Sequence, residues 1–312
     1  MKRLLRRFRT TRRRATSRVQ NTETLETRAL LSNVTVSVTG GNVTVRGNGD
    51  DNVVSITGDG DGLISVKGHE GTTINGEYEF ILPRSFIDGN LRVSLGQGDD
   101  VVTIDNVDVV GAIDVRSGGG DDLVGVLDTE TAGNLRISSG AGDDIVGLRE
   151  LFVGGLSVTT GGGNDQVGLG EVDVNQINIG VFSGSGNASI STGGGNDELA
   201  IAGGQFNNNL RIATGRGDDD VFIRDTNIGN NGTLILGAGN DEAFADNVNV
   251  GRRVVVNGGS GNDDGEVTDA NTNSRPVIRR VENFGVEDAE ARFDELETEI
   301  LNAFDNHDGK DS

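Results

Sequence analysis

The string Gly118-Gly-Gly-Asp-Asp122, of the form G-x-G-[DN]-D, decides the fold because the chain repeats it nine times. The first glycines of successive copies lie 49, 22, 22, 21, 32, 22, 22 and 22 residues apart, so a period of 22 dominates. A fixed period of this length is typical of stacked repeat architectures. The nine copies begin at Gly47, Gly96, Gly118, Gly140, Gly161, Gly193, Gly215, Gly237 and Gly259.

Apolar residues alternate with polar residues on both sides of the string, as in Leu91/Val93/Leu95 before the second copy and Val102/Ile104 after it. This alternation predicts strands with one buried face, and the Gly/Asn/Asp strings predict turns, because these residues tolerate positive φ. Two or three short strands cannot bury their apolar faces alone, whereas stacked units bury them in a continuous column. We therefore expect an all-β, single-stranded parallel β-helix of about ten or eleven laps over residues 33–268.

The sequence outside this region divides into two further segments. Residues 1–32 hold ten basic and two acidic side chains and form a basic segment that serves for export or remains disordered. Residues 269–312 are expected to cap the solenoid. Helical spacing predicts an amphipathic capping helix over 287–304, and the acidic tail after it is expected to be disordered. The apolar positions of this helix are Phe293, Leu296, Ile300, Leu301 and Phe304.

Composition excludes several classes of protein. The chain has no cysteine, so disulfides, thiolate metal sites and cysteine nucleophiles are impossible. No apolar run approaches the ~18–20 residues of a transmembrane helix, so no transmembrane segment is expected. The formal net charge is −22, and the strongly acidic body repels nucleic acid and attracts cations.

The last residue of the string is Asp in all nine copies. Stacked laps would align these aspartates at a spacing of ~4.8 Å, where each neighbouring pair repels by about 0.9 kcal/mol in water and about 3.5 kcal/mol at an effective dielectric constant near 20. A divalent cation between laps removes this repulsion. Ca²⁺ binds oxygens at ~2.3–2.6 Å, so one ion midway between laps reaches a carboxylate on each side, whereas Mg²⁺ fits less well.

The string also resembles the hemolysin-type (RTX) calcium-binding repeat, whose nonapeptide G-G-x-G-x-D-x-U-x forms a calcium-binding turn and a short strand. Gly161-Gly-Gly-Asn-Asp165-Gln-Val167 matches this pattern except for the leading glycine, which Gly258-Gly-Ser-Gly-Asn-Asp263 retains. The family places its nonapeptides in tandem, whereas this chain has one turn per 22 residues, so calcium would occupy one edge only. The resemblance implies several Ca²⁺ ions between successive laps, with Asp51 (shifted by one residue), Asp100, Asp122, Asp144, Asp165, Asp197, Asp219, Asp241 and Asp263 as ligands.

A second resemblance lies near the N-terminus. Leu25-Glu-Thr-Arg-Ala-Leu-Leu-Ser32 resembles the L-E-x-R-x-L-L-S segment that precedes the mature part of many planctomycete extracellular proteins. The resemblance implies an extracellular or cell-surface location. The segment lacks the apolar core of an ordinary signal peptide, and the alternative is a disordered basic arm.

These patterns favour a non-catalytic calcium-binding β-helix with a structural or adhesive role. Surface polysaccharide or matrix proteins are conceivable partners, and the sequence does not fix the oligomeric state. One alternative is a metal-independent scaffold in which each Asp only accepts backbone N–H bonds in its turn. A third alternative is a glycan-active β-helix enzyme, but the chain offers few aromatic platforms for sugars, with no Trp and one Tyr.

Overall fold

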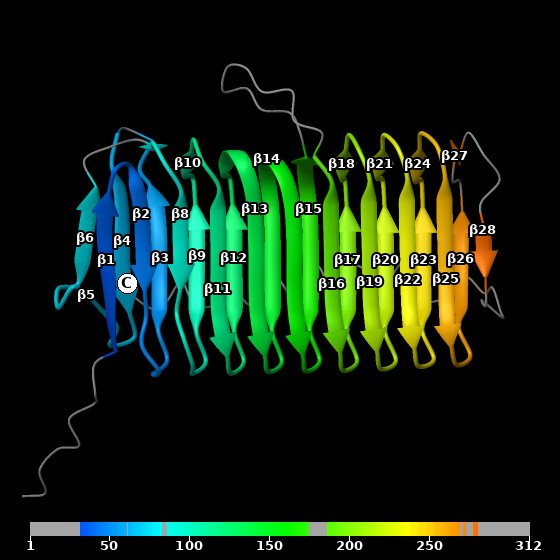
Figure 1. The fold of residues 1–312 in the computed structure, drawn as a ribbon, viewed down its shortest axis with the longest axis horizontal. Coiled ribbons are helices and arrows are strands. Elements are labelled where there is room, and N and C mark those ends of the chain that lie inside the picture. Colours follow the sequence, from blue (N-terminus) through cyan, green and yellow to red (C-terminus); the bar gives the residue numbers. More distant parts are fainter. Residues whose placement is uncertain are drawn as a thin grey trace, which may run out of the picture. The chain divides into compact units, whose positions relative to one another are not determined.

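The structure is a computed structural model that describes residues 32–60, 62–82, 86–174, 186–268, 271–272 and 277–279. All described residues belong to one unit of the chain, Leu31–Ser312. The described part is all-β, as expected, and its parallel strands stack into a β-solenoid (Figure 1). The solenoid has about seven turns of about 22 residues, so the larger expected number of laps is not confirmed.

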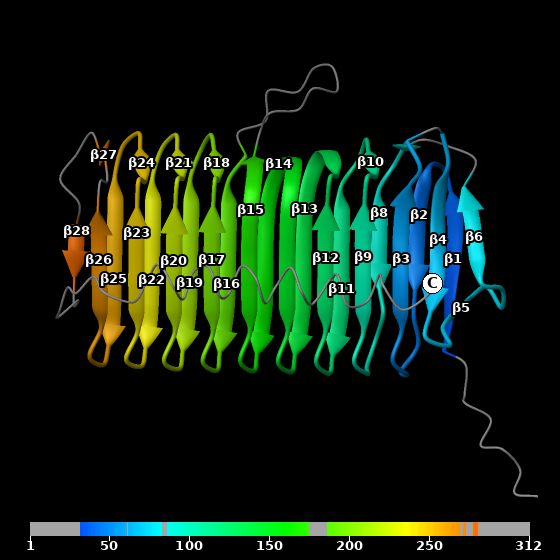
Figure 2. The ribbon, with the colours of Figure 1, turned by 180° about the vertical axis from the view of Figure 1, so that it is seen from behind.

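Each lap contains a strand before the Gly-Asp string, a strand after it and a short third strand. We call the string the corner, and the stacked strands on its two sides the pre-corner wall and the post-corner wall. The corners form one edge of the solenoid, the lower edge in Figures 1 and 2, and the short strands lie along the opposite edge.

The pre-corner wall consists of β2 (Asn42–Arg46), β8 (Leu91–Ser94), β11 (Ile113–Gly119), β16 (Ala188–Gly194), β19 (Leu210–Arg216), β22 (Gly232–Ala238), β25 (Val254–Ser260) and β28 (Val277–Arg279), with parts of β13 (Glu130–Ala141) and β14 (Ile145–Gly162). The post-corner wall consists of β3 (Val53–Gly58), β9 (Val101–Asp105), β12 (Leu123–Leu127), β17 (Glu198–Ala202), β20 (Asp220–Arg224), β23 (Glu242–Asp246) and β26 (Asp264–Thr268), with parts of β14 and β15 (Gln166–Val174). The separate third strands are β7 (Phe86–Ile87), β10 (Asp108–Val109), β18 (Gln205–Phe206), β21 (Asn227–Ile228), β24 (Asn249–Val250) and β27 (Asn271–Thr272).

Equivalent residues of successive laps are paired in parallel register. Ile113 is opposite Leu135 and Gly118 is opposite Gly140, and the same pattern continues along both walls. The glycines allow this close stacking at the corners. Gly118 has φ +133°, and a Cβ atom there would lie 1.8 Å from the carbonyl oxygen of Gly96 in the preceding lap. No residue with a side chain fits at this distance.

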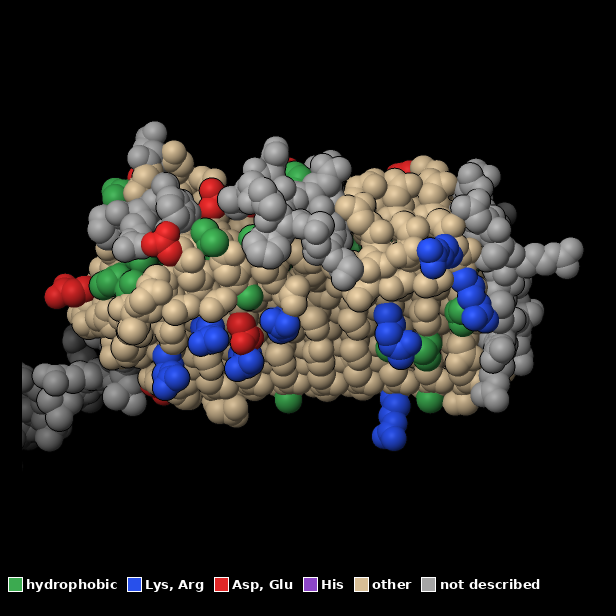
Figure 3. Space-filling view, turned by 45° about the horizontal axis from the view of Figure 1, so that its top comes forward, with side chains coloured by type: hydrophobic (Ala, Val, Ile, Leu, Met, Phe, Trp, Pro, Cys, Tyr) green, Lys and Arg blue, Asp and Glu red, His purple; other side chains and the backbone are tan. Residues whose placement is uncertain are grey.

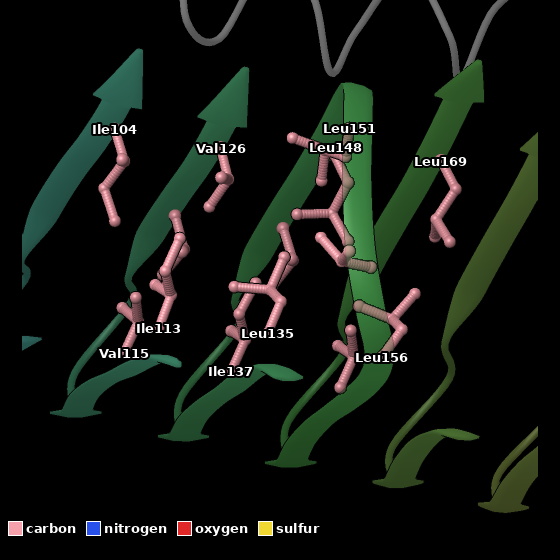
Figure 4. Packing of buried hydrophobic residues seen from close by; sticks show 14 of the residues in the cluster. Ile104, Ile113, Val115, Val126, Leu135, Ile137, Leu148, Leu151, Leu156 and Leu169 are labelled. Carbon is pink, nitrogen blue, oxygen red and sulfur yellow. The ribbon is translucent and has the colours of Figure 1, made fainter. Parts of the chain in front are cut away.

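The apolar side chains that alternate along the strands fill the space between the two walls. Ile113, Val115, Leu135 and Ile137 are at most 2 % exposed, and they belong to one continuous core that runs along the solenoid (Figure 4). Burial of each such side chain stabilises the fold by roughly 1.5–3 kcal/mol. The core therefore fixes the register that aligns the corners.

The N-terminal part of the predicted β-helix differs from a regular lap. β1 (Asn33–Thr39) pairs antiparallel with β2, and β4 (Ile64–His69) pairs antiparallel with both β3 and β6 (Glu79–Leu82). β5 (Thr73–Ile74) pairs in parallel with β1. A two-residue turn at Gly40-Gly41, with φ +57° and +83°, closes the first hairpin, because only residues that accept positive φ form this turn. These hairpins take up residues that the sequence analysis assigned to laps.

No helix occurs among the described residues, and none there is long and apolar enough to cross a membrane. The predicted capping helix over 287–304 and the acidic tail lie outside the described residues, as does nearly all of the basic segment 1–32.

Candidate metal-binding edge

The stacked corners bring the predicted aspartates into one row. Asp100, the last residue of its corner, is fully buried, and its equivalents in the other laps are at most 2 % exposed. We call this row the inner column. It consists of Asn52, Asp100, Asp122, Asp144, Asp165, Asp197, Asp219, Asp241 and Asp263.

The inner column ties each lap to the one before it. The Oδ1 atom of Asp144 accepts a hydrogen bond from the backbone N–H of Asp122 at 3.0 Å, and the other inner aspartates do the same at 2.8–3.3 Å. The turn that the sequence analysis treated as local is therefore a link between laps. The aspartate carboxylate thus accepts a backbone N–H of the preceding lap, as a backbone carbonyl oxygen does within the strands.

The first corner is shifted by one residue. Asn52 takes the inner position and is fully buried, whereas Asp51 is exposed and its Oδ1 accepts the N–H of Asp99 at 2.9 Å. Asp51, which the sequence analysis grouped with the other ligands, thus lies apart from them. The Nδ2 group of Asn52 donates to Asp100 Oδ1 and to the carbonyl oxygen of Asp50, so a neutral amide can occupy the inner position.

A second row, the outer column, runs along the surface of the same edge. Its Oδ1 atoms accept N–H groups from the following lap, as between Asp121 N and Asp99 Oδ1 at 2.9 Å, which is the direction opposite to that of the inner column. This role was not predicted from the sequence, although the restriction of these positions to Asp and Asn is a signal for a side-chain acceptor. The outer column consists of Asp51, Asp99, Asp121, Asp143, Asn164, Asn196, Asp218, Asn240 and Asn262, all exposed.

The second carboxylate oxygen of every inner aspartate lacks a hydrogen-bond partner. The Oδ2 atoms of Asp100, Asp144 and their six equivalents are all buried and accept no hydrogen bond. An unpaired buried charge is costly, so proteins pair such groups, bind a cation beside them or keep them protonated. Eight equivalent orphaned oxygens in one row indicate a property of the fold rather than a local defect.

Burial changes the acidity of the inner column. Desolvation raises the pKa of Asp100, Asp122 and Asp197 to about 6 and that of Asp144 and Asp241 to about 7. It also raises the pKa of Asp165 and Asp219. Two neighbours oppose this shift in the pKa of Asp197: the nearby Thr192 hydroxyl, which itself donates to the Thr214 carbonyl oxygen, and the Asp165 N–H, which Asp197 Oδ1 accepts at 2.9 Å.

A groove gives access to this edge in the middle of the solenoid. It has a volume of about 560 Å³ and is lined by inner residues Asp165 and Asp197, by outer residues such as Asp218, and by Glu198 and Asp220 of the post-corner wall. The groove is therefore rich in carboxylates. Cations from solvent would be concentrated where inner-column residues line its wall.

The inner column fits a cation between laps only with help from other ligands. Neighbouring inner carboxylates are one strand spacing apart, ~4.8 Å, which two Ca²⁺–oxygen bonds can span. Among the described residues, no three His, Asp or Glu side chains come together to hold a metal ion. Two orphaned Oδ2 atoms from adjacent laps would therefore supply the charge, while backbone carbonyls or water complete the oxygen shell.

The chain was compared with protein-family models, curated proteins and solved structures, and no match was found in any of these comparisons.

Proposed function

We propose that the protein is a calcium-binding β-solenoid with a structural or adhesive role outside the cell or on its surface. The observation that supports calcium binding is the row of eight buried, orphaned Oδ2 atoms in register along one edge. Calcium between laps would neutralise these oxygens and the repulsion between them, so binding would stabilise the folded solenoid. The extracellular location rests on the resemblance of Leu25–Ser32 to a segment of exported proteins. Calcium sites in extracellular modules typically have dissociation constants on the order of 10⁻⁴–10⁻³ M, which suits weak sites such as those proposed here.

A calcium titration of the full chain tests this proposal. Thermal unfolding is followed by circular dichroism at pH 8, in EDTA and at increasing Ca²⁺, with Mg²⁺ at equal ionic strength as the control. We expect the unfolding temperature to rise with Ca²⁺ and to rise much less with Mg²⁺. Equal curves in EDTA, Ca²⁺ and Mg²⁺ would overturn the proposal.

The second candidate is a metal-independent scaffold. The observation that favours it is the double ladder, because the inner and outer Oδ1 atoms already join each pair of laps without an ion. In this case the inner carboxyl groups would be protonated, which the raised pKa of Asp144 favours up to about 7. Such a scaffold would be stable in EDTA at pH 5 and would gain nothing from calcium at pH 8.

The C-terminal cap is part of the same proposal. In the last laps, Leu234, Ala243 and Val254 are only partly buried, although they pack against the core. The apolar face of the amphipathic segment over 287–304 would cover this end and complete the burial, as a solenoid requires at each end.

A further inference from the structure

The outward face of the pre-corner wall carries arginines in some laps and none in others. Two outward positions per lap lie in register there. At the first position Asp114 stands between Arg92 of the preceding lap and Arg136 of the following lap. At the second position Ser94 stands between Arg46 and Arg116. The arginines Arg46, Arg92, Arg116 and Arg136 are exposed and come from four successive laps. Figure 3 shows this group of basic side chains, with an acidic side chain among them.

The arginines follow the charge of the outer column lap by lap. The four laps with these arginines have aspartate in the outer column, namely Asp51, Asp99, Asp121 and Asp143. The lap of Asp218 contains Arg211 and Arg216, which are also exposed. In the four laps with outer asparagine neither of these two positions is basic: the residues there are Ser157 and Thr159, Ser189 and Ser191, Thr233 and Ile235, and Val255 and Asn257. In the last of these laps the exposed Arg252 and Arg253 directly precede the strand.

The two sets of charges do not neutralise one another within the molecule. Among the described residues, no arginine forms an ion pair with an outer-column aspartate. Arg116 pairs instead with Asp114 on the same wall at 2.7 Å, and Arg92 and Arg136 have no ion-pair partner in the described part of the chain. The arginines of the pre-corner wall and the aspartates of the outer column both lie on the surface, and both are spaced by whole laps along the solenoid axis.

We infer that this edge is the interface between two copies of the chain, related by a two-fold axis parallel to the solenoid axis. This axis places equivalent laps of the two copies side by side at the same height. Because the second copy is turned by 180°, its row of arginines lies opposite the outer column of the first copy. The arginines of each lap then face the outer-column aspartate of the same lap in the other copy, twice by symmetry. In a lap without the arginine, a negative charge in the outer column would face no positive charge of the other copy, whereas asparagine still accepts the hydrogen bond between laps. The two positions therefore change together.

The inference does not depend on calcium and is tested in EDTA. Asparagine in the outer column keeps the link between laps, since Asn164 Oδ1 accepts the N–H of Asn196 at 2.8 Å. The triple variant Asp99→Asn, Asp121→Asn, Asp143→Asn therefore removes three interface charges without removing a hydrogen bond. The control variant Glu77→Gln, Asp128→Asn, Asp225→Asn removes three exposed charges outside this edge.

Sedimentation velocity of the full chain at low ionic strength gives the dissociation constant of the dimer. We expect the interface variant to raise this constant on the order of tenfold or more, and salt to weaken the wild-type dimer. The control variant should leave the constant unchanged or lower it, because a net charge less negative than −22 reduces repulsion between copies. A monomeric wild type, equal effects of the two variants, or a monomer that uses Arg92 and Arg136 to bind heparin would each overturn the inference.

Discussion

The inner aspartates combine two roles in one side chain. Oδ1 of Asp144 joins two laps by accepting the Asp122 N–H, while Oδ2 is buried without a partner. The sequence predicted the row of aspartates from the 22-residue period. It did not predict that the row is buried, because the direction of a carboxylate depends on the corner backbone, which the spacing alone does not define.

Replacing Asp144 separates the two roles. Asp144→Asn keeps an Oδ1 acceptor, and Asn52 shows that an amide fits the inner position of a corner. The metal-free protein should therefore be at least as stable as wild type at pH 8 while gaining less stability from Ca²⁺. Asp144→Ala leaves the buried Asp122 N–H unpaired and should cost about 1–3 kcal/mol in EDTA. Urea unfolding measures both. Equal stabilities of the Asn and Ala variants in EDTA would contradict the role of Oδ1.

The corner glycines offer a second test at this scale. Gly118→Ala places a Cβ atom against the Gly96 carbonyl at positive φ and should destabilise by more than about 1 kcal/mol. Gly194→Ala is the matched control: its Cβ would meet nothing within 4 Å, so we expect a change within about 0.5 kcal/mol. Urea unfolding measures the free energy of unfolding of both variants. Similar destabilisation by the two substitutions would show that the close stacking of the corners does not cause the effect of Gly118→Ala.

At the scale of the element, the strands on both sides of each corner are confirmed by the structure, since their alternation and the string between them repeat in every lap. The N-terminal hairpins were not predicted. Val34/Val36 and Val43/Val45 alternate in the same way whether their strands pair in parallel or antiparallel. The Gly40-Gly41 turn was the available signal.

The inner column as a whole predicts a pH dependence of the metal-free protein. Burial raises the pKa of Asp144 and Asp241 to about 7, above the value of an unfolded aspartate near ~3.9, so the unfolded state loses these protons first. The stability associated with the protonated carboxyls is therefore fully present below about pH 4 and decreases as the pH rises to about 7. Calcium should reverse the decrease at pH 8.

Thermal unfolding in EDTA between pH 4.5 and 8 measures this dependence. Asp144→Asn with Asp241→Asn should flatten the profile, whereas Asp143→Asn with Asp218→Asn, in the outer column, should preserve its slope. In the fully ionised protein these two pairs change the net charge equally, which separates the effect of the buried groups from that of general repulsion. An unfolding temperature that increases with pH in wild type would contradict the assignment.

At the scale of the whole molecule, we expect residues 287–304 to close the C-terminal end of the solenoid. A chain that ends at Arg279 should unfold at least about 5 °C below the full chain and should bind a hydrophobic dye, since Leu234 and Val254 would be more exposed. Removal of residues 305–312 alone is the control and should change neither property. A shorter chain with full-length stability would show that the segment 287–304 is not a cap.

Calcium binding by the inner column is the central proposal for the whole solenoid. A crystal structure of the full chain grown in calcium, with anomalous scattering to identify the ions, addresses it most directly. We predict calcium between successive laps, bonded to the Oδ2 atoms of neighbouring inner aspartates such as Asp122 and Asp144. The account would be contradicted if the inner aspartates bound no ion, or if calcium were found only in the groove beside Asp218, Glu198 and Asp220.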